Sequence, residues 1–372
     1  MSLQEAIVPN PAGAAAGGVR DAVQKIVSRE LAPQTTAIDK GVLYPADILR
    51  NLGVAGAWST HLARDGKADL RDAIATMSIV SQTCTASGFM AWCQDTLGWY
   101  VLNTDNTALR DRLLPKIATG EQLGGTGLSN PMKTFYGIEQ LRLKAKRAPG
   151  GYVVRGLLPW VSNLGPDHLF GAIMELEDGA GRVMFVADCA APGVTLKACE
   201  PFLAMDGTGT YAVQFRDVFV PDDMVLAHNA MPYVEKVRAG FLLLQFGMAF
   251  GLIRDCIAMM REVKPALGHV NCFLPDQPEH FEKALETIET EVMELASRPY
   301  DPSIAYWRRI IELRLAGGDA CVAAANAAML HCGARGYVMA HRAQRRLREA
   351  WFIAIVTPAT KQLRKMLADT AH

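Results

Sequence analysis

The chain has 372 residues, with 38 Lys plus Arg against 38 Asp plus Glu and a formal net charge of zero. Half of the residues are hydrophobic and a fifth are charged. This composition is typical of a globular protein and excludes disordered, collagen-like and disulfide-scaffold classes. A neutral chain also has no overall field that would attract nucleic acid or an anionic membrane. The length predicts about two to three domains.

The first third of the chain has the periodicity of helices. Apolar residues recur at three- and four-residue spacing from Val19 to Leu31, before Pro33. Tyr44-Pro45 predicts the start of a second helix and Gly53 its end. The pattern continues over 72–84, 90–102 and 109–114. We therefore predict an N-terminal α-helical domain over residues 1–122. No basic segment followed by an apolar run begins the chain, so no leader peptide is expected.

From Gly124 to about residue 226 the sequence has the character of strands. Residues 140–148 alternate between apolar and basic, and Gly150-Gly151 predicts a hairpin turn. Residues 169–176 and 183–187 predict a second hairpin, and 210–220 predict a further strand. Several short strands at this spacing suggest a small barrel or sandwich. The central β domain is predicted to span residues 123–226.

The remainder, residues 227–372, is predicted to form a C-terminal helical bundle. Residues 316–330 are rich in Ala, Gly and Cys, which permits close approach of helices. The apolar stretch 239–253 is interrupted by glycines. It is too short to cross a bilayer and is interpreted as a buried core helix.

Several motifs have an ordinary structural interpretation that is preferred over a functional one. The segment Gly124-Gly125-Thr126-Gly127 suggests a phosphate loop, but neither a preceding strand nor a following helix is predicted, so a glycine-rich entry to the β domain is favoured. The eight cysteines form no C-x-x-C pair and are interpreted as reduced, buried thiols of a cytoplasmic protein. Metal-ligand spacing among His269, His280, His331 and His341 is absent, and no metal site is predicted.

A basic segment contains His341, Arg342, Arg345, Arg346 and Arg348. The favoured interpretation is a solvated helix face with local ion pairs. The alternative is that these side chains bind phosphate, for example that of a coenzyme.

Trp160 and Ser162 are two residues apart on a predicted strand and are expected to share one face. A flat aromatic ring beside a hydroxyl can pack on a heteroaromatic ring and hydrogen-bond to it. On this pair alone, ordinary packing within the β domain is the favoured interpretation.

Four segments, in order along the chain, resemble motifs of the acyl-CoA dehydrogenase family. They are Leu128-Ser129-Asn130-Pro131, the strand Gly156–Asn163, the segment Phe215–Pro221, and Gly333–Tyr337 followed by Arg348-Glu349-Ala350. The resemblance implies an α+β multidomain fold with an N-terminal helical domain, a central β-barrel domain and a C-terminal four-helix bundle. It also implies FAD as cofactor and oxidoreduction at CH–CH donors, with an acyl-CoA or similar acyl or carbonyl compound as substrate.

The resemblance further implies roles for four residues. Ser129 would hydrogen-bond the isoalloxazine ring, Leu128 would contribute backbone contacts, Trp160 would pack on the ring, and Ser162 would lie near N5. A homodimer or homotetramer built through the C-terminal bundle is implied, and an electron acceptor or flavin reductase is a possible partner.

The chain departs from the family pattern in three places. Bulky residues 132–136 replace small ones after the first motif, and no counterpart of an R-x-x-F-G segment occurs in 261–285. The family's catalytic Glu falls on Thr357, and its alternative position falls near Phe241. Glu235 is six residues from Phe241 and so is turned off that helix face. A hydroxyl is a poor base near neutral pH, and no catalytic base is identified.

Two other functions therefore stay open. One is a flavin-dependent monooxygenase on the same fold, which uses reduced flavin and oxygen and needs no Glu at this position. The other is a binding or structural relative without flavin, an interpretation favoured by the bulky segment 132–136.

Overall fold

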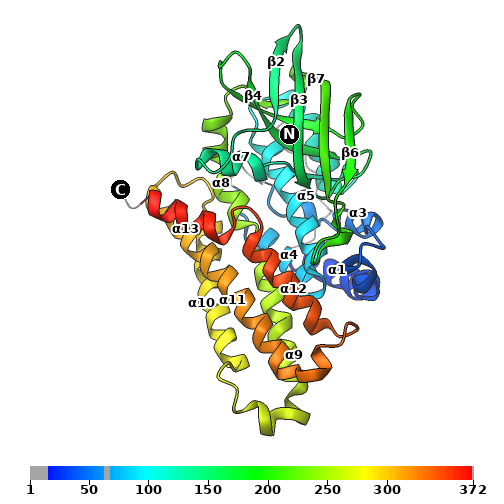
Figure 1. Cartoon of the computed structure of the whole chain (residues 1–372), viewed down its shortest axis with the longest axis vertical. Helices are drawn as coiled ribbons and strands as arrows, with labels where there is room; N and C mark the ends of the chain where they lie inside the picture. The colour runs from blue at the N-terminus through cyan, green and yellow to red at the C-terminus, as the bar shows by residue number, and fades with distance from the viewer. Residues whose placement is uncertain (1–15, 63–67, 371–372) are drawn as a thin grey trace.

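The computed structural model describes residues 16–62 and 68–370. Helices come first along the chain, strands follow, and long helices complete it (Figure 1). The predicted layout of helices, β domain and helices is confirmed. The N-terminal helices are α1 (Ala16–Ile26), α2 (Thr35–Asp39), α3 (Ala46–Val54), α4 (Arg71–Thr83), α5 (Thr85–Asn103) and α6 (Thr107–Thr119), with a π-helical turn at Val27–Leu31 and 3-10 turns at Ala32–Gln34 and Ala57–Ser59.

Helix α5 lies at the centre of the molecule and is buried on every side over almost its whole length. It has no exposed polar face, because its few polar side chains, such as Gln94 and Asp95, are buried as well, as is typical of a helix surrounded by protein. Two tryptophans of α5 fix it to α8, because Trp92 Nε1 donates to the Phe241 carbonyl at 3.1 Å and Trp99 Nε1 to the Val237 carbonyl at 3.0 Å. These two hydrogen bonds hold α5 in a fixed position against α8.

The sheet has eight strands in the order β6-β7-β3-β2-β4-β5-β8, with β1 paired to β4. Most pairs are antiparallel, but β4 is parallel to both β1 and β2. The sheet has a hydrophobic cluster of its own, which includes Val154, Phe170, Phe185 and Phe215. The strands are β1 (Gly124–Thr126), β2 (Lys144–Ala148), β3 (Gly151–Val161), β4 (Leu169–Leu176), β5 (Arg182–Asp188), β6 (Val194–Ala198), β7 (Tyr211–Pro221) and β8 (Val225–Ala227), with 3-10 turns at Asp206–Thr208 and Asp222–Met224.

The β domain is confirmed, but the expected closure into a barrel is not. In the described residues no strand pairing joins β6 to β8, so the sheet is open. The strand expected over 140–148 begins only at Lys144, and β1, β6 and β8 were not predicted. A short helix, α7 (Ser129–Phe135), also follows β1 where no helix was expected.

The C-terminal helices are α8 (Ala230–Leu243), α9 (Phe246–Asn271), α10 (Pro278–Ala296), α11 (Ile304–Gly336), α12 (Arg342–Ile355) and α13 (Thr360–Asp369). Helix α10 buries a stripe at alternating four- and three-residue spacing against its neighbours: Phe281, Leu285, Ile288, Val292 and Leu295. The span Ala230–Asn271 contains an 18-residue window apolar enough to cross a membrane, and 89% of that window is buried inside the protein. The stretch 239–253 is buried as expected, but it is not one helix, because α8 ends at Leu243 and α9 begins at Phe246.

Gly251 of α9 allows close packing against α4, and we expect Gly251→Ala to destabilise the protein. A Cβ at this position would lie 2.5 Å from both the Gln82 amide nitrogen and the Ser78 carbonyl oxygen of α4. Because both contacts are backbone atoms, the helices must separate, at a cost of about 1–3 kcal/mol. Urea unfolding measures the change.

Gly268 on the same helix provides the matched control. Its added Cβ would meet only the flexible Lys264 side chain, at 3.4 Å. Gly268→Ala should therefore gain up to about 1 kcal/mol from helix propensity. Equal stabilities for the two variants would contradict the packing argument.

Candidate functional site

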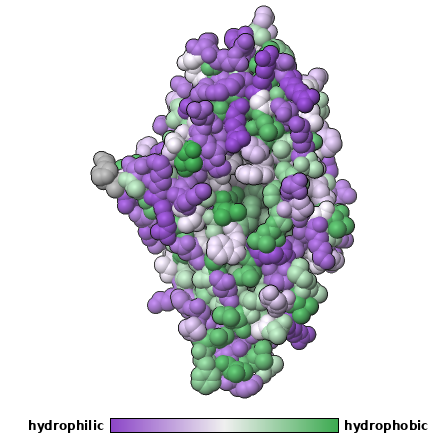
Figure 2. All heavy atoms as spheres, viewed as in Figure 1, coloured by the Kyte–Doolittle hydropathy of each residue, from purple (hydrophilic) through white to green (hydrophobic). Residues whose placement is uncertain are grey.

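A cavity of about 380 Å³ lies between one end of the sheet and the helices α5, α8 and α12. In Figure 2, hydrophobic side chains gather around the hollow below the sheet. Its lining is mostly apolar and aromatic, with a few hydroxyl groups, as is typical of small-molecule sites. The lining residues are Phe89, Trp92, Cys93, Thr126, Ser129, Lys133, Trp160, Ser162, Phe202, Leu203, Ala204, Met205, Thr208, Thr210, Phe241, Arg348, Trp351, Phe352, Ile355, Val356 and Thr357.

The cavity brings together residues that the sequence analysis selected from distant segments. Ser129, Trp160 and Ser162 line it, as do Thr357 and Phe241. Leu128 is fully buried behind the surface and does not line the cavity. Three of the four predicted cofactor contacts therefore line the cavity from the β domain. The two positions expected for a catalytic Glu, Thr357 and Phe241, line it from the helices.

Trp160 and Ser162 line the cavity, but the backbone that carries them is not the regular strand that was expected. A register irregularity in the β3–β7 pairing lies between Leu158 and Val161, and Trp160 has φ = 57°. A β-bulge redirects side chains in this way. Trp160 is 57% exposed, whereas Ser162 lies beyond the end of β3 and is 7% exposed. The expectation that the two share a strand face is wrong, although both line the cavity.

The two glycines that begin the β domain serve packing and not phosphate binding. A Cβ on Gly124 would lie 1.9 Å from the Leu169 carbonyl oxygen, and one on Gly125 would lie 2.3 Å from that of Ser162. Only glycine lets β1 approach β4 and the Ser162 backbone this closely. The favoured interpretation of this segment as an entry to the β domain is confirmed.

A chain of hydroxyl groups fixes the direction of the Ser162 proton. Thr208 Oγ1 donates its single proton to the Met205 carbonyl at 2.7 Å, so it accepts from Thr210 Oγ1 at 2.8 Å. Thr210 then accepts from Ser162 Oγ at 2.7 Å. Each hydroxyl has one proton and two lone pairs. Ser162 therefore presents lone pairs to the cavity and is suited to accept a hydrogen bond from a ligand N–H.

Ser129 and Thr357 meet across the cavity wall. Their hydroxyl oxygens are 2.8 Å apart, joining α7 of the β domain to the turn after α12. The Thr357 carbonyl accepts from Gln245 Nε2 at 2.9 Å, and Gln245 Oε1 accepts from Arg314 Nε at 2.7 Å. Burial lowers the pKa of the Arg314 guanidinium to about 10. Thr357 is thus held in place by a buried network.

None of the residues lining the cavity is Asp or Glu, among the part of the chain that the structure describes. Glu235 is exposed on α8, as its spacing from Phe241 predicted. Burial raises the pKa of the Cys93 thiol far above its usual range, which keeps the thiol neutral. The cavity has hydroxyls and two cations, Lys133 and Arg348, but no general base.

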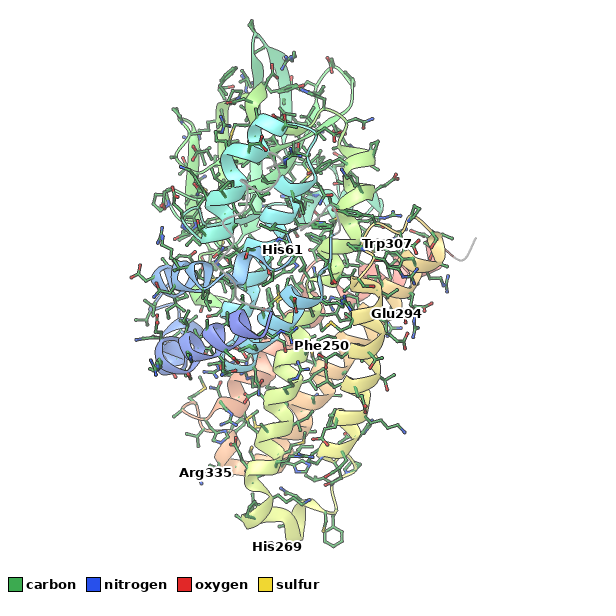
Figure 3. All side chains as sticks on the ribbon, turned by 180° about the vertical axis from the view of Figure 1, so that it is seen from behind. His61, Phe250, His269, Glu294, Trp307 and Arg335 are labelled. Atoms are coloured by element: carbon green, nitrogen blue, oxygen red, sulfur yellow. The ribbon has the colours of Figure 1, made fainter. Side chains whose placement is uncertain are left out.

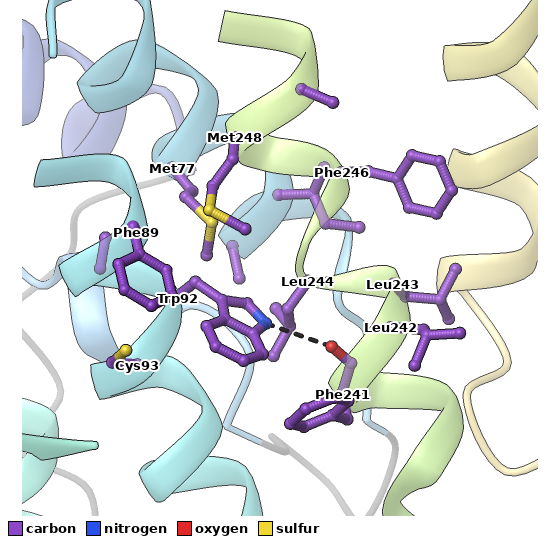
Figure 4. Packing of buried hydrophobic residues seen from close by; sticks show 14 of the residues in the cluster. Met77, Phe89, Trp92, Cys93, Phe241, Leu242, Leu243, Leu244, Phe246 and Met248 are labelled. Atoms are coloured by element: carbon purple, nitrogen blue, oxygen red, sulfur yellow. Dashed lines mark hydrogen bonds between the residues drawn. The ribbon is translucent and has the colours of Figure 1, made fainter. Parts of the chain in front are cut away.

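Aromatic rings form the end of the cavity against α5 and α8. The Phe89 and Trp92 rings are stacked at 5.7 Å, and Phe241 meets Trp92 edge-on at 5.0 Å. Figure 4 shows these rings beside Cys93, with the Trp92 indole donating to the Phe241 carbonyl. This end of the cavity offers apolar contacts to a ligand.

Comparison with known proteins gives one family. A family model described as the acyl-CoA dehydrogenase N-terminal domain matches residues 16–121. Benzylmalonyl-CoA dehydrogenase of Aromatoleum aromaticum is 23% identical over 64% of this chain, and mitochondrial isovaleryl-CoA dehydrogenase of Pongo abelii is 25% identical over 57%. The matches span 65% and 52% of those two relatives. Butyryl-CoA dehydrogenase of Megasphaera elsdenii superposes with a TM-score of 0.85 at 16% identity, covering 96% of this chain and 97% of that structure.

The chain has the acyl-CoA dehydrogenase fold, and its residues 16–121 match the N-terminal domain of that family. Thr208 and Thr210 could not be predicted as site residues, because their relation to Ser162 depends on the pairing of β3 with β7. Their spacing, Thr208-Gly209-Thr210 at the start of a predicted strand, was the available signal.

The histidines are widely separated: Figure 3 shows His61 beside the N-terminal helices and His269 at the far end of the bundle. No metal-type cluster of His, Cys, Asp or Glu occurs within the described ranges.

The residues that line the cavity fit the ring half of FAD. A half-exposed indole, Trp160, offers a flat face, and the hydroxyls of Ser129 and Ser162 lie on the same lining. The fit does not extend to the diphosphate. Lys133 pairs with Glu139 at 3.0 Å and Arg348 with Asp39 at 2.9 Å, so both lining cations already have a partner.

Proposed function

We propose that this chain is an FAD-dependent oxidoreductase that acts on an acyl-CoA or a similar acyl or carbonyl compound. The observation that carries the proposal is the cavity itself. It gathers Ser129, Trp160 and Ser162 from the β domain opposite Thr357 and Phe241 from the helices. Fold and family support the same class of reaction.

The residues that line the cavity have different proposed roles. Trp160 provides a stacking face, and Ser162 accepts a hydrogen bond from a ligand N–H because its own proton is committed to Thr210. Ser129 and Thr357 form a neutral hydroxyl pair beside the reacting region. The rings of Phe89, Trp92 and Phe241 offer apolar contacts to a ligand. Bound FAD would supply the two-electron chemistry, which no side chain of the cavity provides.

The neutral lining also supports a second candidate function. Removing an α-proton requires a base within hydrogen-bond reach, and no carboxylate lines the described cavity. A flavin-dependent monooxygenase, which combines reduced flavin with oxygen, does not need that base. Its partner would be a flavin reductase, whereas a dehydrogenase would need an electron acceptor. For either function we propose a homodimer or homotetramer.

Anaerobic spectroscopy separates the two functions. Dehydrogenation predicts that the flavin absorption bleaches when a panel of acyl-CoAs is added without oxygen. A spectrum that stays unchanged, together with oxygen uptake when a flavin reductase and its reduced nicotinamide are supplied, would instead support the monooxygenase.

We expect Thr357→Glu to create or raise acyl-CoA dehydrogenation. The new carboxylate would lie beside Ser129, at the family position of the base. A positioned base contributes about 10²- to 10⁴-fold, and an engineered one should supply at least about tenfold. Anaerobic dye reduction with the acyl-CoA panel measures the gain.

Thr357→Gln is the matched control, since it has the same size and no basic group. Equal rates for the Glu and Gln variants would show that the cavity serves another substrate.

A further inference from the structure

The basic segment of α12 is not the solvated face that the sequence favoured. Arg345 and Arg346 are 7% and 1% exposed. They line a second cavity, of about 420 Å³, at the start of α12 and against α2 and the end of α4. The Arg348–Asp39 pair separates the two cavities, because Arg348 lines the first and Asp39 lines the second.

The buried guanidinium of Arg346 has hydrogen-bond acceptors for all of its nitrogens. Nε donates to Asp255 at 2.6 Å, and Nη1 donates to Glu349 at 2.8 Å and to Thr85 at 2.9 Å. The Ser81 and Gln82 carbonyls accept two further hydrogen bonds. All three nitrogens are engaged, so Arg346 has a structural role.

Arg345, its neighbour in sequence, is buried without such partners. Its hydrogen bonding in the described part of the chain is one contact from Nη2 to the Thr83 carbonyl, at 3.3 Å. Its nearest ion-pair contact is 3.7 Å, from Nε to Glu349 Oε1, and neither atom has a hydrogen-bond partner. A guanidinium has five N–H donors, and burying them unpaired is unfavourable. The Nε of Arg345 therefore lacks a hydrogen-bond acceptor among the residues that the structure describes.

The lining of the second cavity carries an excess of positive charge. Its charged side chains are Lys40, Arg342, Arg345 and Arg346 against Asp39 and Asp255, four positive and two negative. Both carboxylates are already paired, Asp39 with Arg348 and Asp255 with Arg346 and Arg342. Arg342 is itself paired with two carboxylates, because it also contacts Glu262 at 2.6 Å. Exposed Lys40 forms no ion pair within the described ranges. The first turn of α12 adds the positive end of a 14-residue helix.

We propose that this cavity binds a phosphorylated small molecule, with the phosphate at Arg345 and Lys40. Two oxygens of a phosphate can accept two parallel N–H bonds from one guanidinium. The cavity is of the size of small-molecule sites and exceeds what one phosphate fills. The ligand is therefore a phosphate ester or diphosphate with an attached group, as in a nucleotide. This site lies outside the cavity of the proposed oxidoreductase and does not depend on that function.

Isothermal titration calorimetry of the full chain tests the proposal, with ADP and inorganic pyrophosphate as probes. We expect ADP to bind, and Lys40→Ala to weaken it at least fivefold. Lys283→Ala, an equally exposed lysine on α10, should leave the affinity unchanged. ADP binding tighter than pyrophosphate would support a ligand with an attached group, whereas equal affinities of the two probes would contradict that part of the proposal. No binding of either probe, or equal affinities of the Lys40 and Lys283 variants, would overturn the proposal.

Arg345→Gln provides a second test with a different readout. It should abolish ADP binding without lowering the melting temperature in phosphate-free buffer, because the charge it removes is poorly paired. A fall of more than about 3 °C would show a structural role and contradict the proposal. Neither readout requires flavin or turnover, so a failure here is distinct from a failure of the proposed oxidoreductase.

Discussion

Replacing Trp160 with alanine is expected to lower the affinity for FAD by about five- to 150-fold, the range that corresponds to 1–3 kcal/mol of lost stacking. The indole is 57% exposed and lines the cavity, so it has a free face for a ring. Because so little of it is packed in the protein, the variant should keep the stability of the parent. Flavin content after gel filtration and fluorescence titration of the apoprotein both measure the effect.

Three further variants sharpen this result. Trp160→Phe should keep part of the affinity, since it retains an aromatic face. Ser162→Ala removes one hydrogen-bond acceptor and should weaken FAD by about fivefold, the equivalent of about 1 kcal/mol. Phe273→Ala is the control, because this side chain is 85% exposed on the loop after α9 and lines neither cavity. Unchanged flavin binding by Trp160→Ala and Ser162→Ala would place the ring elsewhere.

Arg346→Met is expected to lower the free energy of unfolding by about 3–5 kcal/mol. Burial disfavours the charged guanidinium, but Asp255 and Glu349 outweigh it and hold its pKa above the ordinary value. Removing Arg346 leaves those two carboxylates without their shortest ion pairs, and leaves the Ser81 and Gln82 carbonyls without a donor. The hydrogen bonds of Arg346 connect α12 to α4, α5 and α9, so their loss should destabilise all of these helices together. Urea unfolding measures it.

Arg309→Met is the comparison for this prediction. Arg309 also pairs with two carboxylates, Glu291 and Glu312, but its side chain is 44% exposed. Surface pairs of this kind contribute about 0–1 kcal/mol. If the two variants lose equal stability, the buried network does not have the importance that its hydrogen bonds indicate.

The sequence predicted the order of elements because helix periodicity and strand alternation are local signals. The helices at 46–54, 71–83 and 85–103 and the strands at 169–176 and 211–221 follow from such patterns. Closure of the sheet depends on which edge strands pair, and β6 and β8 are too short to signal this. The predicted boundaries near residues 122 and 226 stay predictions.

The site could be predicted in its residues but not in its geometry. Ser129, Trp160, Ser162 and Thr357 were selected by motif, yet the left-handed backbone of Trp160 and the hydroxyl chain through Thr210 depend on the register of β3 against β7. The basic segment was misjudged for a related reason. Charge alone does not show whether an arginine faces water or other helices, and here α12 turns Arg345 and Arg346 inward.

The most direct test of the central claim is the visible absorption spectrum of the purified chain after saturation with FAD and gel filtration. A retained flavin band, with about one flavin per chain in the parent and less in Trp160→Ala, is the result that the cavity predicts. No flavin band in the parent after added FAD would contradict the oxidoreductase and leave a binding or structural relative of the family.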